Sequence, residues 1–171
     1  KGGMELGLKL LEEYNDSVLF INERFDVKGD RVKKIENGIK HLTKEIFNEY
    51  NCLIFIMATG IVVRSIAPLL ESKAKDPAII VLDEKGQNVI SLLSGHLGRA
   101  NEITLDIAKR LKSNPVITTA SDVKDSMAVD TLAMKLNLTI EELEKATKVT
   151  AHIVNGEKVG IICRDKLNIK L

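Results

Sequence analysis

The chain has 171 residues, of which 44% are hydrophobic, so it can bury the core of one ordinary domain and is not expected to be disordered. Its 25 basic and 24 acidic residues leave a net charge of +1, which argues against a phosphate-neutralising nucleic-acid binder and against a polybasic membrane anchor. The apolar runs are far shorter than the ~20 residues that cross a bilayer, and no signal sequence is recognised at the start.

Cysteine and histidine usage indicates the compartment and argues against a metal centre. Cys52 and Cys163 lie inside apolar runs, which predicts buried free thiols in a reducing compartment. His41, His96 and His152 are too scattered to have metal-ligand spacing, so no metal site is expected. We therefore expect a cytoplasmic protein.

Short β-branched runs alternate with amphipathic stretches, which is typical of an α/β domain. Helical spacing predicts a helix over 6–14, and the run SVLFI predicts a strand over 17–21. A second helix face spans 39–50. The uniformly apolar run CLIFIM at 52–57 predicts a central strand covered on both faces. A helix should follow from about Gly60.

The next two strands determine the direction of the sheet. Strands are predicted at 78–82 and 88–93, and the intervening DEKGQ is too short for a helix, so this pair should be a hairpin. The hairpin reverses the chain. After a helix over 100–111, the strand at 115–119 should therefore run antiparallel to the strand at 52–57. We predict a three-layer α/β domain with a mixed, mostly parallel sheet.

The character of the sequence changes after residue 137. Thr139 and Glu142 form a capping-box pattern ahead of a helical stretch, and 159–163 reads as a strand. A lone helix and strand cannot close a core. We expect an N-terminal domain over 1–137 and an incomplete second α/β segment over 138–171. The chain also begins in a helix, so a strand before it is expected to be missing.

Polar residues gather where predicted strands end, the usual place for ligands in open α/β sheets. In TGIVVR, at 59–64, Thr59 can cap the next helix, and backbone N–H groups around Gly60 can hold an anion. Arg64 can bind a carboxylate with two hydrogen bonds. A capped helix with one solvent-facing arginine explains the same pattern.

A second polar cluster, SGHLGRAN, lies at 94–101 between a strand and a helix. Gly95 and Gly98 flank His96 and permit a tight backbone that a ligand can approach closely. His96 can act as a general acid or base near neutral pH, and Ser94 as a nucleophile or as a hydrogen-bonding group. A plain structural turn remains the alternative.

The third cluster, TTASD, spans 118–122. Thr118, Thr119 and Asp122 supply more polar side chains than one turn needs, and Asp122 can cap the following segment or orient a histidine. The predicted strand directions put this cluster and the one at 94–101 at the same sheet edge. Thr59 should start at the opposite edge, with its helix running back.

Four blocks carry a family resemblance: 57–70 (MATGIVVRSIAPLL), 75–86 (KDPAIIVLDEKG), 90–101 (ISLLSGHLGRAN) and 115–122 (PVITTASD). Together and in this order they resemble the cobalt-precorrin-5A hydrolases of anaerobic cobalamin biosynthesis. The resemblance implies opening of the ring-A δ-lactone of a cobalt corrinoid, release of acetaldehyde, and formation of cobalt-precorrin-5B. It also implies a C-terminal domain that this chain does not contain. Arg99 departs from the family, in which Gly is usual after Leu97-Gly98.

Lactone hydrolysis needs an activated water and a group that stabilises the oxyanion. We predict that His96 is the base, that Asp122 orients it, and that Ser94 is a third catalytic group. The residues predicted to bind the carboxylates of the substrate are Thr59, Gly60, Arg64, Gly95, Gly98, Arg99, Asn101, Thr118 and Thr119.

Cobalt belongs to the substrate, so no resident cofactor is expected. The expected partners are the cobalt-corrinoid intermediate, a second copy of the chain and neighbouring pathway enzymes, but neither nucleic acid nor a membrane. The alternative function is a non-catalytic corrinoid-binding or scaffolding domain, with catalysis in the absent C-terminal domain. A generic nucleotide-binding domain is disfavoured because the GxGxxG and Walker patterns are missing.

Overall fold

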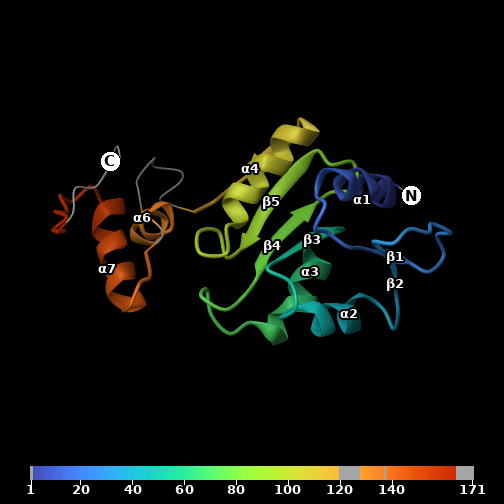
Figure 1. Ribbon diagram of the computed structural model, residues 1–171, viewed down its shortest axis with the longest axis horizontal. Helices are drawn as coiled ribbons and strands as arrows, with labels where there is room; N and C mark the ends of the chain where they lie inside the picture. Colours follow the sequence, from blue (N-terminus) through green and yellow to red (C-terminus); the bar gives the residue numbers. More distant parts are fainter. Residues whose placement is uncertain (1, 120–127, 137, 165–171) are drawn as a thin grey trace. The chain divides into compact units, whose positions relative to one another are not determined.

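The computed structural model describes residues 2–119, 128–136 and 138–164 (Figure 1). Contacts between Cα atoms divide the chain into two units, residues 1–116 and 117–171. The first unit consists of α1 (Gly2–Glu13), β1 (Leu19–Asn22), β2 (Val32–Ile35), α2 (Ile39–Ile46), β3 (Cys52–Ile56), α3 (Thr59–Ile66), a 3₁₀ turn (Ala67–Leu69), β4 (Ala78–Leu82), β5 (Asn88–Leu93), α4 (Ala100–Leu111) and β6 (Asn114–Val116).

The main sheet is mixed and mostly parallel, as predicted. Its strand order is β3-β4-β5-β6, and β1 and β2 form a separate parallel pair. β3 and β4 are parallel, β5 and β6 are parallel, and β4 and β5 run antiparallel. The predicted hairpin between β4 and β5 is therefore confirmed, and so is the antiparallel direction of β6 relative to β3.

The carboxylate of Asp83 organises the turn of this hairpin. Its Oδ1 accepts hydrogen bonds from the backbone N–H groups of Lys85 (3.0 Å) and Gln87 (3.2 Å), and its Oδ2 accepts one from Asn88 (2.7 Å). Gly86 takes a positive φ of 66°, where a side chain would be strained. An aspartate and a glycine thus provide what a tight reversal requires.

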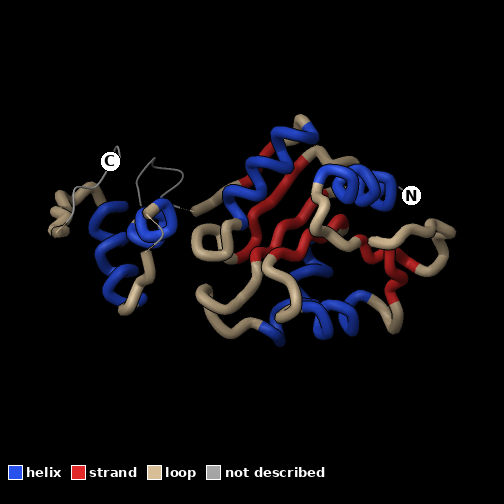
Figure 2. The backbone as a smooth tube through the Cα atoms, in the orientation of Figure 1, coloured by secondary structure: helices blue, strands red, loops and turns tan. Residues whose placement is uncertain are grey.

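Helices cover both faces of the sheet in the first unit (Figure 2). Successive strand residues point to opposite faces, so Ile80 and Leu82 pack with Ile107 of α4 on one face. On the other face, Ile79 and Val81 of β4 pack with α3. α1 contributes to the first cluster, and the end of α2 contributes to the second. This gives the predicted three-layer architecture.

The position of β3 corrects one expectation. The sequence predicts it as a central strand, but it lies at the edge of the four-stranded sheet, and Ile54 is 37% exposed. β4 is the strand whose residues are all buried. A uniformly apolar run indicates that helices cover the two faces of a strand. It does not indicate whether the strand has a hydrogen-bonded neighbour along each edge.

In the second unit, α6 (Val129–Lys135) packs with α7 (Leu143–Val154). The backbone N–H of Val129 donates to Oγ1 of Thr150 at 3.0 Å. Because α6 pairs with α7, the structure divides the chain after Val116, earlier than the boundary at 137 that the sequence suggests. None of the helices in the described ranges is long and apolar enough to cross a membrane.

Three local expectations for the second unit are wrong: the capping box at Thr139 and Glu142, the strand over 159–163 and the burial of Cys163. α7 begins after Glu142, which carries no side-chain capping bond, so Thr139 does not open this helix. Residues 159–163 form no strand and are exposed, Cys163 included. Cys52, in the first unit, is a free thiol that is half-buried, and burial raises its pKa to about 11.

Replacing Asp83 with Ala should lower the free energy of unfolding by about 1 kcal/mol, because three backbone N–H groups lose their acceptor. Desolvation acts to raise the pKa of Asp83, but the hydrogen bonds from Asn88, Gln87 and Lys85 outweigh it and hold the pKa below its usual range. A lowered pKa in the folded state stabilises the protein above the unfolded-state value, and this contribution is lost as the pH falls below about 4.

Urea unfolding of the wild type and the D83A variant at pH 7 and pH 3 measures both effects. The two proteins should differ clearly at pH 7 and less at pH 3. The exposed neighbour Glu84, replaced with Ala, serves as the control and should change stability little. Equal stability of D83A and wild type at pH 7 would show that the turn does not need this carboxylate.

Candidate functional site

The strand directions separate the predicted site residues into two opposite edges of the sheet. Thr59 follows the carboxyl end of β3, whereas Ser94 follows the end of β5, which runs the other way. The hydroxyl of Ser94 donates to the backbone oxygen of Asp76 at 2.9 Å, just ahead of β4. The loop that carries His96 therefore lies where β4 begins, as the predicted directions require.

The loop from Ser94 to Arg99, called the His96 loop below, has a tightly constrained backbone. Ser94 and Arg99 have positive φ values of 57° and 63°, a region that residues other than glycine rarely occupy. The N–H of Arg99 donates to the oxygen of His96 (2.8 Å), and the N–H of Ala100 to that of Ser94 (3.2 Å). A Cβ atom on Gly98 would lie 2.5 Å from Cβ of Ser94, so this position requires glycine.

Asn101 is only 6% exposed and is hydrogen-bonded to the His96 loop. Its Oδ1 accepts a hydrogen bond from the hydroxyl of Ser91 (2.6 Å), and its backbone N–H donates to the oxygen of Gly95 (3.0 Å). A Cβ on Gly95 would lie 2.8 Å from the same Oδ1. This burial argues against the direct substrate contact that the sequence predicts and makes Asn101 a residue that positions the loop.

The side chains of Ser94 and Arg99 are engaged within the protein. The Ser94 hydroxyl is already donating to Asp76, so the structure does not present it as a free nucleophile. Arg99 binds Glu102 with two hydrogen bonds, Nε to Oε2 at 2.8 Å and Nη2 to Oε1 at 2.7 Å. This pairing lowers the pKa of Glu102. The side chains of Arg99 and Glu102 are both exposed, so the carboxylate of a ligand can still compete with Glu102 for Arg99.

His96 itself is partly exposed, as expected for a base that must reach water. Its predicted orienter, Asp122, lies outside the described residues. Thr118 and Thr119 follow β6 and belong to the second unit, where Thr118 is exposed and Thr119 half-buried. In residues 2–119, 128–136 and 138–164, no group of three or more His, Cys, Asp or Glu side chains is arranged to hold a metal ion.

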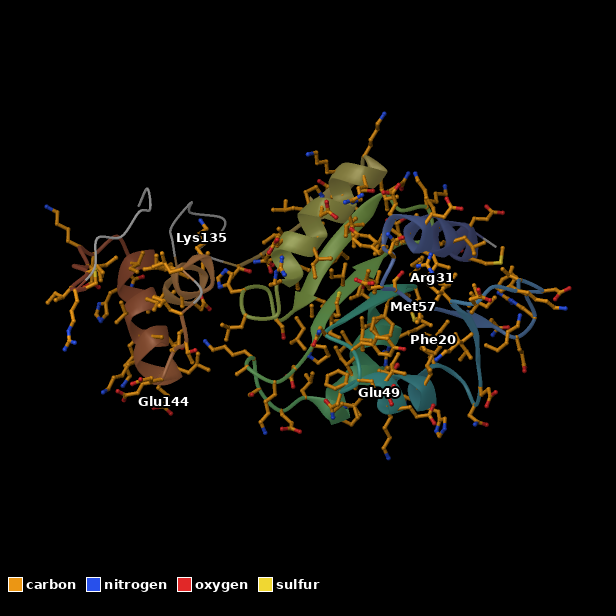
Figure 3. All side chains as sticks on the ribbon, viewed as in Figure 1. Phe20, Arg31, Glu49, Met57, Lys135 and Glu144 are labelled. Carbon is orange, nitrogen blue, oxygen red and sulfur yellow. The ribbon has the colours of Figure 1, made fainter. Side chains whose placement is uncertain are left out.

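A cleft of about 540 Å³ opens at the other edge, at the carboxyl ends of β3 and β4. Met57, labelled in Figure 3, Thr59 and the hairpin residues Asp83, Glu84 and Asn88 contribute to its lining. The sequence analysis interpreted the hairpin residues only as a turn. Their polar side chains next to the carboxyl end of β4 were the signal that could have placed them at a site. Ala58, without a side-chain capping bond, is the N-cap of α3, so the capping role predicted for Thr59 is wrong.

Arg64 does not reach this cleft. It lies in the last turn of α3, and its Nη1 donates to the backbone oxygen of Gly60 at 2.9 Å. Arg64 is one of the residues that line a separate hollow of about 290 Å³, together with Lys40 and Lys44 of α2. Gly60 is exposed at the start of α3. The predicted site residues thus occupy distinct places on the first unit and do not form one cluster.

Comparisons with known proteins identify the family. Residues 41–122 match the family model described as cobalamin synthesis G N-terminal, and residues 127–171 match the one described as cobalamin biosynthesis central region. Over 166 residues the chain is 39% identical to the cobalt-precorrin-5A hydrolase of Priestia megaterium. The chain belongs to the cobalt-precorrin-5A hydrolase family. The family resemblance of the four sequence blocks is thereby confirmed.

Other members of the family differ in how much of their length this chain matches. The cobalt-precorrin-5A hydrolase of Salmonella typhimurium is 48% identical over 127 residues, which are 74% of this chain and 36% of the relative. The Priestia protein is matched over 95% of this chain and 44% of its own length. The chain therefore spans less than half the length of these family members.

A solved structure supports the fold. The crystal structure of a cobalamin biosynthesis protein G homolog from Sulfolobus solfataricus aligns with a TM-score of 0.53 at 24% sequence identity. The alignment covers 98% of this chain and 48% of that protein. At this identity the likeness is evidence of a shared fold.

Replacing Gly98 with Ala should unfold or distort the His96 loop, because the new methyl group would lie 2.5 Å from Cβ and 2.8 Å from the backbone oxygen of Ser94. We expect a loss of about 1–3 kcal/mol in the free energy of unfolding, the range typical of overpacking. Urea unfolding measures it. Gly160→Ala, where nothing lies within 4 Å, is the matched control. Unchanged stability of the Gly98 variant would contradict the tight loop.

Arg99 occupies a left-handed backbone conformation, which costs about 1 kcal/mol for a residue with a side chain. Arg99→Gly should therefore keep or raise stability despite losing the surface pair with Glu102. Arg99→Ala should lower stability, because it loses that pair and keeps the strain. Thermal unfolding of the two variants tests the order, and an Ala variant more stable than the Gly variant would refute it.

Proposed function

We propose that this chain is the N-terminal part of a hydrolase that opens the ring-A δ-lactone of cobalt-precorrin-5A, with release of acetaldehyde, to give cobalt-precorrin-5B in cobalamin biosynthesis. The observation that carries the proposal is the 48% identity over 127 residues to a cobalt-precorrin-5A hydrolase. Because the chain spans less than half of that relative, the activity is proposed for the whole protein and not for this chain alone.

The first unit supplies the base in this proposal. Lactone hydrolysis joins the oxygen of a water to the acyl carbon and releases the ring oxygen as an alcohol. The alcohol then loses its O–H proton and becomes the carbonyl of acetaldehyde, while its carbon–carbon bond to the macrocycle breaks and leaves the electron pair on the macrocycle. One proton must leave the water, and one must reach the ring oxygen. His96 is assigned the first transfer, because histidine titrates near neutral pH and this imidazole is partly exposed on a constrained loop.

Asp122, Thr118 and Thr119 keep the roles that their residue types suggest. Asp122 stays the proposed orienting carboxylate, and Thr118 and Thr119 stay proposed hydrogen-bond donors to the oxyanion. Ser94 is reassigned from a catalytic group to a residue that holds the loop, because its hydroxyl donates to Asp76. Asn101 is reassigned in the same way, because it is buried beneath Gly95.

The surroundings are proposed on the same basis. Cobalt arrives with the substrate, so no resident cofactor is proposed. The proposed compartment is the cytoplasm, and the proposed partners are the corrinoid, a second copy of the chain and neighbouring enzymes of the pathway. Residues 138–171 are proposed to begin a central domain that further polypeptide completes.

A second candidate function is a corrinoid-binding domain whose catalysis lies elsewhere in the protein. One observation favours it: the hydroxyl of Ser94 and the carboxamide of Asn101 are engaged in holding the His96 loop itself. Replacement of His96 separates the two functions, because only the catalytic function needs a base at this position.

Replacing His96 with Ala in the full-length protein should lower kcat by roughly 10²–10⁴, the range expected on removal of a general base, with little change in KM. Release of acetaldehyde from cobalt-precorrin-5A measures the turnover. His152→Ala is the control, because this histidine is exposed in α7, pairs with Glu157 and has no proposed role. Near-normal turnover of H96A would favour the binding domain over the catalytic one.

A further inference from the structure

The hollow between α2 and α3 has cationic side chains that the proposed reaction does not use. It is lined by Lys40, Lys44, Arg64, Ser65, Pro68 and Leu69. The two lysines project from α2, and the other residues come from α3 and the 3₁₀ turn after it. The cleft at the carboxyl ends of β3 and β4 shares no lining residue with it.

The three cations of this hollow are not neutralised within the part of the chain that the structure describes. Lys40, Lys44 and Arg64 are all exposed, and none of them lies within ion-pair distance of a described carboxylate. The hydrogen bond from Arg64 to Gly60 uses Nη1, so the guanidinium has further donors to offer a ligand. The hollow is thus a concentration of positive charge on a chain whose net charge is only +1.

Lys40 is also unfavourable for α2 itself, whereas Lys44 in the last turn suits the helix dipole. Lys40 stands in the first turn of the helix, where the helix dipole disfavours a cation, and no acidic residue accompanies it there. Lys40 and Lys44 are four residues apart, so their like charges repel each other along one face. Residues that break local rules without an internal compensation are expected where a ligand provides it.

The apolar lining residues of the hollow add a second property. Leu69 is half-buried next to the exposed Pro68, and the hydroxyl of Ser65 donates its hydrogen to the backbone oxygen of Ile61 (2.9 Å). The lining of the hollow therefore combines apolar and cationic side chains. The cleft at the other edge carries Asp83 and Glu84 and would repel an anion. The hollow between α2 and α3, rather than this cleft, therefore suits a ligand that carries anionic groups on an apolar skeleton.

The course of the chain places the hollow toward the edge at which the His96 loop lies. β3 and β4 are parallel neighbours, so α3 must return from the end of β3 to the start of β4. The hollow is lined by Ser65, Pro68 and Leu69 at and after the end of α3. The hydroxyl of Ser94 donates to the backbone oxygen of Asp76, just before β4. A broad ligand held by its carboxylates in the hollow can thus extend toward the His96 loop.

We propose that Lys40, Lys44 and Arg64 form a carboxylate-binding site for a polycarboxylate macrocycle. The cations bind peripheral carboxylates, and Pro68 and Leu69 contact the apolar skeleton between them. The identity of the macrocycle as the corrinoid substrate rests on the proposed function, whereas the site itself rests on the charges and shape of the hollow.

Binding of uroporphyrin, a tetrapyrrole with a carboxylate on every peripheral side chain, tests the site in the full-length protein. Lys40→Gln combined with Lys44→Gln should raise the Kd about tenfold, as expected for two charge-assisted contacts at a partly exposed site. Added salt should weaken binding by the wild type more than by the double variant. Lys9→Gln with Lys28→Gln removes the same charge from exposed positions elsewhere and is the matched control. An equal rise of Kd in the control pair, or no rise in the test pair, overturns the proposal.

A further variant excludes misfolding as the cause of lost binding. Lys40→Glu puts an acidic residue in the first turn of α2 and creates a favourable pair with Lys44, so the midpoint of urea unfolding should rise while uroporphyrin binding falls. A fall of both would overturn the proposal, because the lysine would then stabilise the helix. If the wild-type protein fails to release acetaldehyde from cobalt-precorrin-5A, the proposed function is wrong. The uroporphyrin Kd of these variants still tests whether the hollow binds carboxylates.

Discussion

Strand β4 buries every one of its five side chains, from Ala78 to Leu82, with exposed fractions of 0–1%. Each buried Ile, Leu or Val contributes about 1.5–3 kcal/mol relative to an exposed one. Because alternate residues point to opposite faces, this single strand anchors the helix layers on both sides. The residues just before β4 receive the hydroxyl of Ser94, and those just after it form the hairpin. The His96 loop at one edge of the sheet and the hairpin at the other are therefore both held in place by the ends of β4.

The sequence predicted the features that depend on local chemistry. A five-residue polar turn between two apolar runs can only reverse the chain, so the hairpin and the mixed sheet could be derived from the residues alone. The separation of Thr59 from His96 followed from the same reversal. Features that depend on distant contacts could not be derived. The edge position of β3 and the strand β2 are decided by which strands meet in space, and the run VKKI at 32–35 has no strong alternation.

The candidate site shows the same limit at the level of single side chains. Residue type suggested that Ser94, Arg99 and Asn101 were available to a substrate, because hydroxyl, guanidinium and carboxamide groups recognise carboxylates. In the structure the first donates to Asp76, the second pairs with Glu102, and the third lies under Gly95. The positions of polar residues in the sequence can predict that a polar group lies near a site. Whether the protein itself already uses that group depends on contacts that sequence spacing does not specify.

Gly98 and Asn101 fix the shape of the His96 loop from two sides, and two residues other than glycine are held at positive φ. Such backbone states persist only where the surroundings over-determine them. The loop therefore does not need a ligand to acquire its form. Binding at this place would lose little conformational entropy, so more of the interaction energy with a large, rigid ring remains as affinity.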